Sequence, residues 1–214
     1  MKLSPRLAAL AGLVPPCGYA ADIGSDHGLL PAFLLENGVC RGVAVTDLSA
    51  PSLEKAKDLF RRRGLSADFA AADGLKGLSR PADAIVIAGM GGQEIIRILK
   101  ADPAPARSAV LVLQPMKNAR ELRLFLTGNG FEITRERVAR EGRRFYQMFA
   151  ARAGEQTLSE AELWFGRQTE NTPELSAFLD AREQKLRNDI RRAPGNLRLR
   201  AELSALCEVR TWLT

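Results

Sequence analysis

Short apolar runs alternate with amphipathic stretches through the first two thirds of the chain. The runs predict strands over 19–22, 42–47, 67–71, 84–88 and 110–114. Stretches with apolar residues three or four positions apart predict helices over 3–13, 29–37, 51–63, 93–100 and 118–128. This alternation predicts an α/β fold, in which right-handed crossovers connect a parallel sheet. Two runs around Gly142, 131–138 and 145–152, predict an antiparallel pair that closes the sheet.

The last part of the chain has a helical pattern throughout. A short helix is expected over 159–166, and a longer helix begins at Pro173, with leucines repeating on one face. The turn residues 194–196 precede a second striped helix over 199–213. The sequence therefore predicts two domains, an α/β domain over 1–153 and a helical hairpin or coiled coil over 154–214.

The first expected strand ends at Asp22. A turn with the sequence Ile23-Gly24-Ser25-Asp26-His27-Gly28 follows, and a helix comes after it. Ligands of open α/β sheets bind at the carboxyl ends of the strands, where this turn lies. Gly24 and Gly28 permit a positive φ and a close approach of the backbone to a ligand. The spacing differs from the G-x-G-x-x-G of dinucleotide-binding enzymes and lacks the Lys-Ser/Thr of a P-loop. A carboxylate before the turn favours a cationic ligand such as S-adenosylmethionine (SAM); the alternative is an ordinary strand–helix connection.

Two further carboxylates follow expected strands. Asp47 ends the second strand, where an acidic residue typically accepts hydrogen bonds from ribose hydroxyls. Its alternative role is to cap the next helix, which Ser49 is equally placed to do. Asp73-Gly74 follows the third strand, where a carboxylate is placed to accept a hydrogen bond from an adenine amino group; the alternative is a plain turn.

The segment after the fourth strand is Ala88-Gly89-Met90-Gly91-Gly92. Enzymes that methylate an exocyclic amino group commonly place an Asn or Asp, two prolines and an aromatic residue there. This segment offers none of these, but it offers open backbone and room for a base turned out of its stack. Because a ring nitrogen already has a nucleophilic lone pair, the segment favours attack by a ring nitrogen over attack by an amino group.

Composition and charge narrow the function further. With 46% hydrophobic and 26% charged residues, the chain can bury a full core, and no apolar run reaches the ~18 residues of a membrane span. Three widely spaced cysteines favour neither a disulfide framework nor a zinc site, and indicate a reducing cytoplasm.

The net charge of +6 is concentrated in residues 1–153, which hold 22 Lys and Arg against 15 Asp and Glu. The basic excess includes Arg61, Arg62, Arg63, Arg135, Arg137, Arg140, Arg143 and Arg144. A basic surface is typical of nucleic-acid binding, although solvated helix faces give the same pattern.

Three segments taken together, Asp22–Gly28, Ala88–Gly92 and Leu113-Gln114-Pro115, resemble the TrmK family of bacterial tRNA (adenine(22)-N(1))-methyltransferases. The match runs in order over residues 1–152, and the predicted tail resembles the family's C-terminal coiled-coil domain. The resemblance implies a class I, Rossmann-like SAM-dependent methyltransferase fold with no metal. It also implies transfer of a methyl group from SAM to N1 of an adenine in tRNA, at position 22. A catalytically silent RNA-binding module and a small-molecule methyltransferase remain the alternatives.

The resemblance also implies roles for individual residues. Asp22 and Gly24 are expected at the methionine end of SAM, Asp47 at the ribose, and Asp73 with Gly74 at the adenine. The full expected cofactor set is Asp22, Gly24, Ser25, Asp26, His27, Gly28, Asp47, Leu48, Asp73, Gly74 and Gly89. The expected catalytic set is His27, Met90, Gln114 and Pro115. For His27, the only histidine in the chain, the alternative is a packed, hydrogen-bonded turn residue. For Asp26 the alternative is a helix cap, and for Met90 it is core packing. A monomer or weak homo-oligomer in the cytoplasm, with tRNA as its partner and no membrane contact, completes the expectation.

Overall fold

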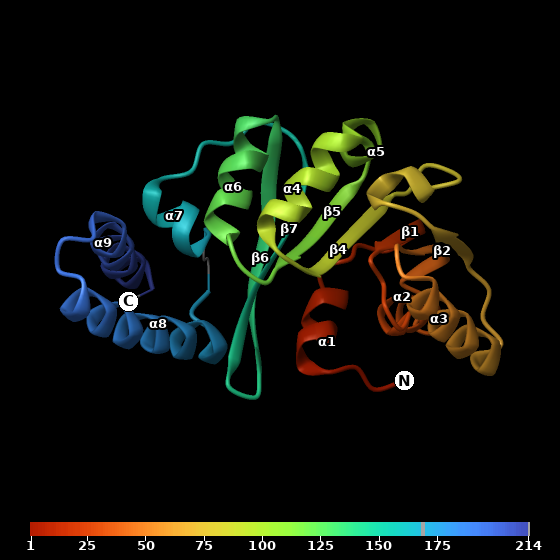
Figure 1. Cartoon of the computed structure of the whole chain (residues 1–214), viewed down its shortest axis with the longest axis horizontal. Coiled ribbons are helices and arrows are strands. Elements are labelled where there is room, and N and C mark those ends of the chain that lie inside the picture. The colour runs from red at the N-terminus through yellow and green to blue at the C-terminus, as the bar shows by residue number, and fades with distance from the viewer. Residues whose placement is uncertain (168–169, 214) are drawn as a thin grey trace.

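The centre of the molecule is a seven-stranded sheet with the order β3-β2-β1-β4-β5-β7-β6 (Figure 1). The computed structural model describes residues 1–167 and 170–213. The strands are β1 (Cys17–Ile23), β2 (Cys40–Asp47), β3 (Asp68–Ala71), β4 (Ala84–Met90), β5 (Val110–Pro115), β6 (Phe131–Glu141) and β7 (Arg144–Ala153). Strands β1 to β5 are parallel, and β7 is antiparallel to both β5 and β6. The strand order reverses between β1 and β4, and ligands of such sheets bind at the carboxyl ends of the strands at this switch point.

Helices cover both faces of the sheet. The helices α1 (Pro5–Ala11), α2 (Leu29–Glu36) and α3 (Ala50–Arg63) pack on one face, and α4 (Gly92–Ala101), α5 (Pro103–Ser108) and α6 (Ala119–Gly128) on the other. The central strands are therefore buried on both sides, which explains why β4 is a continuous apolar run without polar alternation. The predicted α/β sheet and its antiparallel closing pair are confirmed.

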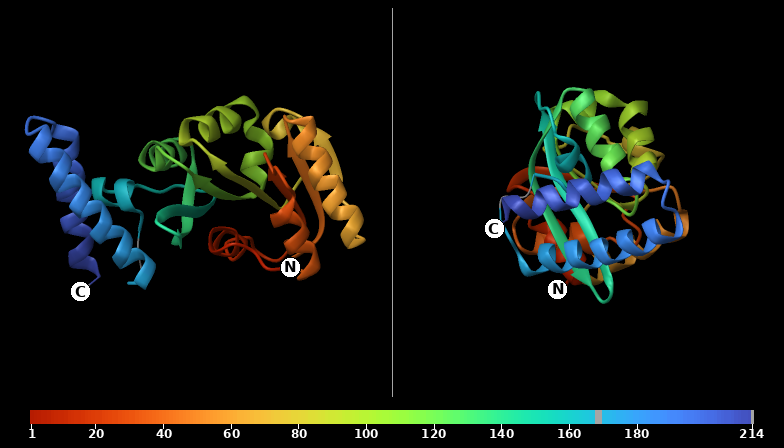
Figure 2. Two further views of the ribbon diagram at one scale, coloured as in Figure 1. Left: turned by 60° about the horizontal axis from the view of Figure 1, so that its bottom comes forward. Right: turned by 90° about the vertical axis from the view of Figure 1, so that its left-hand side faces the viewer.

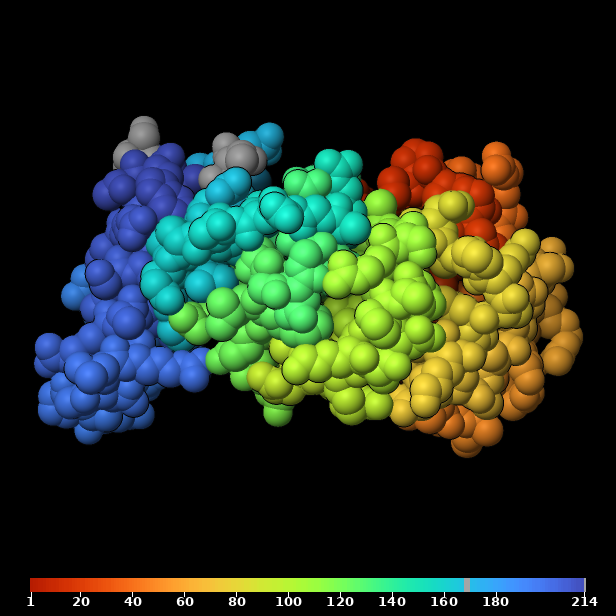
Figure 3. All heavy atoms as spheres, turned by 90° about the horizontal axis from the view of Figure 1, so that it is seen from above, coloured from red at the N-terminus to blue at the C-terminus, as the bar shows by residue number. Residues whose placement is uncertain are grey.

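The tail forms its own apolar cluster at one end of the molecule. It consists of α7 (Glu160–Phe165), α8 (Pro173–Arg192) and α9 (Leu197–Trp212), which pack around Leu186, Leu206 and Val209. The α8 and α9 helices lie side by side beyond β6 (Figure 2), and the space-filling view shows the tail as one end of an elongated molecule (Figure 3). The predicted helical hairpin is thus present, whereas its coiled-coil character and the boundary at residue 153 stay predictions.

A buried arginine joins the tail to the sheet. Arg123 of α6 is 1% exposed and donates to the Glu136 carboxylate of β6 at 2.8 Å. It also donates to the carbonyl oxygens of Leu163 and Trp164 in α7, at 3.2 and 3.3 Å, and to Oε1 of Gln147 in β7 at 2.9 Å. One guanidinium group therefore connects α6, α7 and both strands of the β6–β7 hairpin.

Three local differences from the predicted elements have simple causes. Helix α5 and the short 3₁₀ helix η1 (Gly74–Gly77) were not predicted, because neither shows apolar periodicity. The β6–β7 hairpin continues past the predicted limits to Glu141 and Arg144, since its outer residues are polar and the apolar pattern ends before the pairing does. Among the residues that the structure describes, every helix is too short or too polar to span a bilayer.

Candidate functional site

The turn after β1 contains three residues with a left-handed backbone. Gly24, Asp26 and Gly28 have φ angles of 70°, 52° and 69°. The N–H groups of Gly24 and Ser25 donate to the carbonyl oxygen of Thr46 in β2, at 2.8 and 3.0 Å, which ties the turn to the neighbouring strand. A positive φ is uncommon for a residue such as Asp26, and backbone strain of this kind clusters at ligand sites.

The two predicted glycines of this turn have different neighbours. A Cβ atom on Gly28 would lie 2.9 Å from Cβ of Ala56 in α3, so this glycine permits close packing of α2 on α3. A Cβ atom on Gly24 would lie 2.1 Å from Cε of Met90, at the end of the sheet where ligands bind. The predicted close approach to a ligand therefore suits Gly24, whereas packing explains Gly28.

Asp22 carries a buried carboxylate at the base of the turn. The residue is 6% exposed, and Oγ of Ser25 donates to its Oδ2 at 2.5 Å. Burial raises the pKa of Asp22 to about 6; the Ser25 hydroxyl lowers the pKa, the Asp47 carboxylate raises it and the Arg6 guanidinium lowers it by smaller amounts. A desolvated carboxylate of this kind is stabilised in its charged form by a cationic partner.

Asp47 connects the turns after β1 and β2. Its Oδ2 accepts a hydrogen bond from the N–H of Asp26 at 3.0 Å, and its Oδ1 accepts one from the N–H of Ser49 at 2.7 Å. Ser49 is the N-cap of α3, because its Oγ accepts from the N–H of Ser52 at 3.3 Å. The capping role thus belongs to Ser49, and Asp47 is left beside a cavity.

Asp73 lies next to the same cavity but is ion-paired. Arg97 of α4 donates to both carboxylate oxygens of Asp73, at 3.0 and 2.6 Å, and also to Glu94. These hydrogen bonds from Arg97 hold the pKa of Asp73 below its ordinary value. The Asp73 side chain is almost half exposed, so a ligand can reach its carboxylate. An adenine amino group bound there would lie beside the Arg97 guanidinium.

Two cavities meet at the carboxyl ends of β1, β2 and β4. The larger, of about 420 Å³, brings together the predicted Asp22, Gly24, Ser25, Asp26, His27 and Gly89. The smaller, of about 180 Å³, brings together the predicted Gly24, Asp47, Leu48, Asp73, Gly74 and Met90. Gly24 lines both cavities, and the Met90 methyl group lies against it, so the Met90 side chain stands where the two cavities meet.

His27 lies at the open side of the larger cavity. Its side chain is 51% exposed, and its Nε2 is 3.3 Å from Oδ2 of Asp26. The exposed position contradicts the alternative of a packed turn residue. Asp26 does not cap α2, because the N-cap of that helix is Gly28 and has no side-chain hydrogen bond.

Residues from distant segments complete the larger cavity, and the sequence patterns did not indicate them. Arg6 comes from α1, Glu141 and Tyr146 from the β6–β7 hairpin, and Met116 follows β5. The nearest sequence signal was Tyr146, one of two tyrosines in the chain, within a conspicuously basic segment. The aromatic ring that is missing after β4 is thus supplied to this cavity from β7.

Arg6 is held at this cavity by three contacts. Its Nη1 donates to Oε1 of Gln114 at 2.9 Å, and its N–H donates to Oε2 of Glu141 at 3.1 Å. Its guanidinium carbon lies 5.6 Å from the centroid of the Tyr146 ring. Oε1 of Gln114 also accepts from the N–H of Gly89 at 3.2 Å. Gln114 therefore connects Arg6 to the end of β4.

Two members of the predicted catalytic set do not line either cavity. Gln114 and Pro115 are buried at the end of β5, and neither lines the larger or the smaller cavity. The geometry makes Gln114 a positioning residue for Arg6 and Gly89. Close packing explains Gly92, because a Cβ atom there would lie 2.5 Å from the carbonyl oxygen of Asn118.

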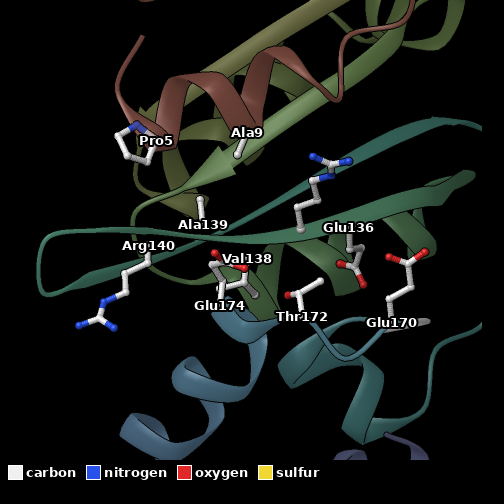
Figure 4. A pocket seen from close by; sticks show the side chains of 10 residues that line it. Pro5, Ala9, Glu136, Val138, Ala139, Arg140, Glu170, Thr172 and Glu174 are labelled. Carbon is white, nitrogen blue, oxygen red and sulfur yellow. The ribbon is translucent and has the colours of Figure 1, made fainter. Parts of the chain in front are cut away.

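A third cavity, of about 410 Å³, lies between α1, β6 and the start of α8 (Figure 4). The charged groups that line it are Glu136, Arg137, Arg140, Glu170 and Glu174, so carboxylates outnumber guanidinium groups. None of the predicted site residues lines this cavity. Apart from Gly28, the residues that the sequence predicted for cofactor binding therefore gather at the two cavities that share Gly24, and not at this one.

Comparisons with known proteins agree with this site. Residues 3–149 match a family model described as "Methyltransferase domain". The chain is 33% identical over 160 residues to the tRNA (adenine(22)-N(1))-methyltransferase of Bacillus subtilis, an alignment that covers 72% of this chain and 67% of the relative.

Solved structures share the fold over almost the whole chain. The crystal structure of the B. subtilis m1A22 tRNA methyltransferase TrmK superposes with a TM-score of 0.77 at 26% identity, covering 99% of this chain and 97% of the other. The Streptococcus pneumoniae protein Sp1610, solved in complex with S-adenosyl-L-methionine, gives a TM-score of 0.88 at 27% identity, covering 97% of this chain and 99% of the other. Given the family model and the B. subtilis relative, this chain belongs to the methyltransferase-domain family and, within it, to the TrmK family of tRNA (adenine(22)-N(1))-methyltransferases.

Proposed function

We propose that this protein transfers a methyl group from SAM to N1 of an adenine in tRNA, at position 22. The observation that carries the proposal is the pair of cavities joined at Gly24, with a carboxylate at the end of each of the first three strands. The matched relative from B. subtilis is named for this reaction and this nucleotide. The proposal extends both to the present chain.

The residues of the larger cavity fit the amino-acid end of SAM. That end carries an ammonium and a carboxylate group. The buried Asp22 carboxylate suits the ammonium group, and Arg6, which lines the same cavity, suits the carboxylate. Cation binding would lower the pKa of Asp22 from about 6 and keep it ionised at neutral pH.

The smaller cavity fits the nucleoside end. Asp47 would accept hydrogen bonds from the ribose hydroxyls, and Asp73 would accept one from the adenine amino group after sharing or leaving Arg97. Gly24 stands between the two ends, where its missing side chain leaves room for the backbone to approach the sulfur. The Met90 methyl group now occupies that place and would turn aside.

When bound, SAM supplies a methyl group on a positively charged sulfur. The C–S bond breaks as the C–N bond to adenine N1 forms, and N1 uses its own lone pair, so no residue of this chain has to remove a proton first. The protein's task is positioning, which contributes about 7–11 kcal/mol in well-oriented reactions. The exposed His27 and the open backbone at Gly89 border the larger cavity where the adenine must enter.

The test is incubation of the protein with labelled SAM and bulk unmodified tRNA, followed by nucleoside analysis near neutral pH, so that N1-methyladenosine does not rearrange. N1-methyladenosine is the expected product. N6-methyladenosine as the primary product, or methylation of guanosine or cytidine only, would overturn the proposal. A protein that binds SAM but leaves tRNA unmodified would indicate a small-molecule methyltransferase, and one that binds tRNA but not SAM would indicate a silent RNA-binding module.

Cofactor binding is tested separately by thermal shift. SAM binding should stabilise the folded protein by RT ln(1 + [L]/Kd) and therefore raise its melting temperature. Asp47→Ala should remove most of that rise. Asp189→Ala, which removes a carboxylate from α8 in the tail, is the matched control and should leave the shift unchanged. With tRNA as substrate, we also place the reaction in the cytoplasm.

A further inference from the structure

The β6–β7 hairpin extends beyond the sheet that carries it. Strand β7 pairs with β5 only from Phe149 to Ala151, whereas it pairs with β6 out to Arg144 and Glu141. The outer part of the hairpin therefore has no neighbouring strand on its β5 side, and Figure 1 shows it projecting past the ends of the other strands. An element of this kind can reach a ligand that does not fit inside the domain.

This hairpin carries the chain's most conspicuous cluster of unpaired positive charge. The exposed arginines are Arg135, Arg137, Arg140, Arg143 and Arg144. Within the part of the chain that the structure describes, none of the five forms an ion pair with a carboxylate, whereas Arg120 of α6 and Arg167, which follows α7, do. Exposed like charges repel one another and add no stability to the fold. Their concentration on one projecting element therefore indicates a polyanionic partner.

The same hairpin reaches into the methyl-transfer cavity. Tyr146 lies opposite Ala139 in the register and lines the larger cavity together with Asp22 and Gly89. Its ring is partly buried and is steadied by the Arg6 guanidinium. Tyr146 is two residues from Arg144, so the cavity-lining ring and the unpaired arginines of the tip belong to one rigid strand pair.

We propose that the β6–β7 hairpin is the RNA-docking element of this enzyme, with Tyr146 as the stacking platform for the target adenine and Arg143 and Arg144 as contacts to the flanking phosphates. The inference rests on the proposed function. An adenine inside a tRNA stem or fold must leave its stack to reach a methyl donor, and an aromatic ring in the pocket replaces the lost stacking. The third cavity, which Arg137 and Arg140 also line, has more carboxylates than guanidinium groups and does not suit a phosphate backbone, so the phosphate contacts are assigned to Arg143 and Arg144.

The first experiment measures tRNA binding without turnover, by fluorescence anisotropy of labelled tRNA at several salt concentrations. The double variant Arg143→Gln/Arg144→Gln should weaken binding at low salt by at least about tenfold and reduce the slope of log Kd against log [salt] by about one for each arginine. The matched control is Arg41→Gln/Arg107→Gln, which removes the same charge from exposed residues near the opposite, amino-terminal ends of β2 and β5. Equal slopes for the two double variants would overturn the docking role of the hairpin.

The second experiment tests the platform by steady-state kinetics with tRNA as the varied substrate. Tyr146→Phe keeps the ring and should stay within a few-fold of the wild type, whereas Tyr146→Leu keeps an apolar side chain without a ring and should lose about ten- to a hundredfold in kcat/KM. Because Tyr146 also contacts Arg6, each variant is assayed at a SAM concentration that saturates it, and urea unfolding checks that both variants keep the fold. Equal kcat/KM values for the Phe and Leu variants would overturn the stacking role.

The two proposals fail separately. If the wild type binds tRNA through the hairpin, as the salt slopes report, but transfers no methyl group, the docking inference stands and the proposed function falls. If the wild type forms N1-methyladenosine and the hairpin variants behave like their controls, the proposed function stands and the docking inference falls. If the wild type does not bind tRNA at all, both are wrong.

Discussion

Replacing Asp22 with Asn should stabilise the free protein while removing cofactor binding. The Asp22 carboxylate is buried and has a pKa of about 6, raised mainly by burial from an ordinary value of 3.8. Asn cannot ionise, but its amide oxygen can still accept the hydrogen bond from Ser25. The variant therefore removes the burial cost of a charge and keeps the local geometry of the turn.

The magnitude follows from the difference in pKa between the folded and unfolded states. Because the folded-state pKa of Asp22 is the higher one, its contribution to stability is fully present below pH 3.8 and is lost as the pH rises through 6. By pH 7 the loss amounts to about 3 kcal/mol, at about 1.4 kcal/mol per pKa unit. At pH 5 the same linkage gives about 2 kcal/mol, so the stability of the Asn variant relative to the wild type should grow by about 1 kcal/mol between pH 5 and pH 7.

The assay is urea unfolding of both proteins without cofactor at pH 5, 6 and 7. Other titrating groups are shared by the two proteins and largely cancel in the difference. SAM should then reverse the order at pH 7, because the wild type gains binding free energy that the variant lacks. A difference between the proteins that is flat from pH 5 to pH 7 would show that Asp22 is not a desolvated carboxylate. Unchanged SAM affinity in the Asn variant would remove it from the cofactor site.

Two further substitutions test the turn and the junction with the tail. Gly24→Ala should lose SAM binding, measured by calorimetry, because its Cβ would take the place of the Met90 methyl group at the meeting point of the cavities; Gly38→Ala is the control, with a similar φ of 64° and open space around it, and should cost only the ~1–2 kcal/mol of an alanine in this conformation. Arg123→Met should lower the free energy of unfolding by about 3–5 kcal/mol in urea titrations, because it leaves the Glu136 carboxylate buried without its partner. Adding Glu136→Gln to Arg123→Met should restore part of that loss, and a double variant as unstable as the single one would contradict the buried-charge explanation.

The sequence by itself determined the sheet, the helical tail and the three carboxylates that line the two cavities at Gly24. Strands buried on both faces must be continuous apolar runs, so β1, β2, β4 and β5 were readable without tertiary information. Asp22, Asp47 and Asp73 were readable for a related reason, since the residue that follows such a run lies where open α/β sheets bind ligands. These patterns involve residues that are close together in the chain, so they can be recognised from the sequence without tertiary contacts.

The tertiary structure alone decided which distant residues complete the site. Arg6 and Glu141 are 135 positions apart and are joined by a hydrogen bond at the same cavity as Tyr146. No periodicity links them, because they meet only when α1 packs against the β6–β7 hairpin at one face of the sheet. The same packing buries Gln114 beneath Arg6 and leaves the hairpin tip without a paired strand on its β5 side. The sequence did not predict the full length of this hairpin, because its outer residues are polar and show no apolar pattern.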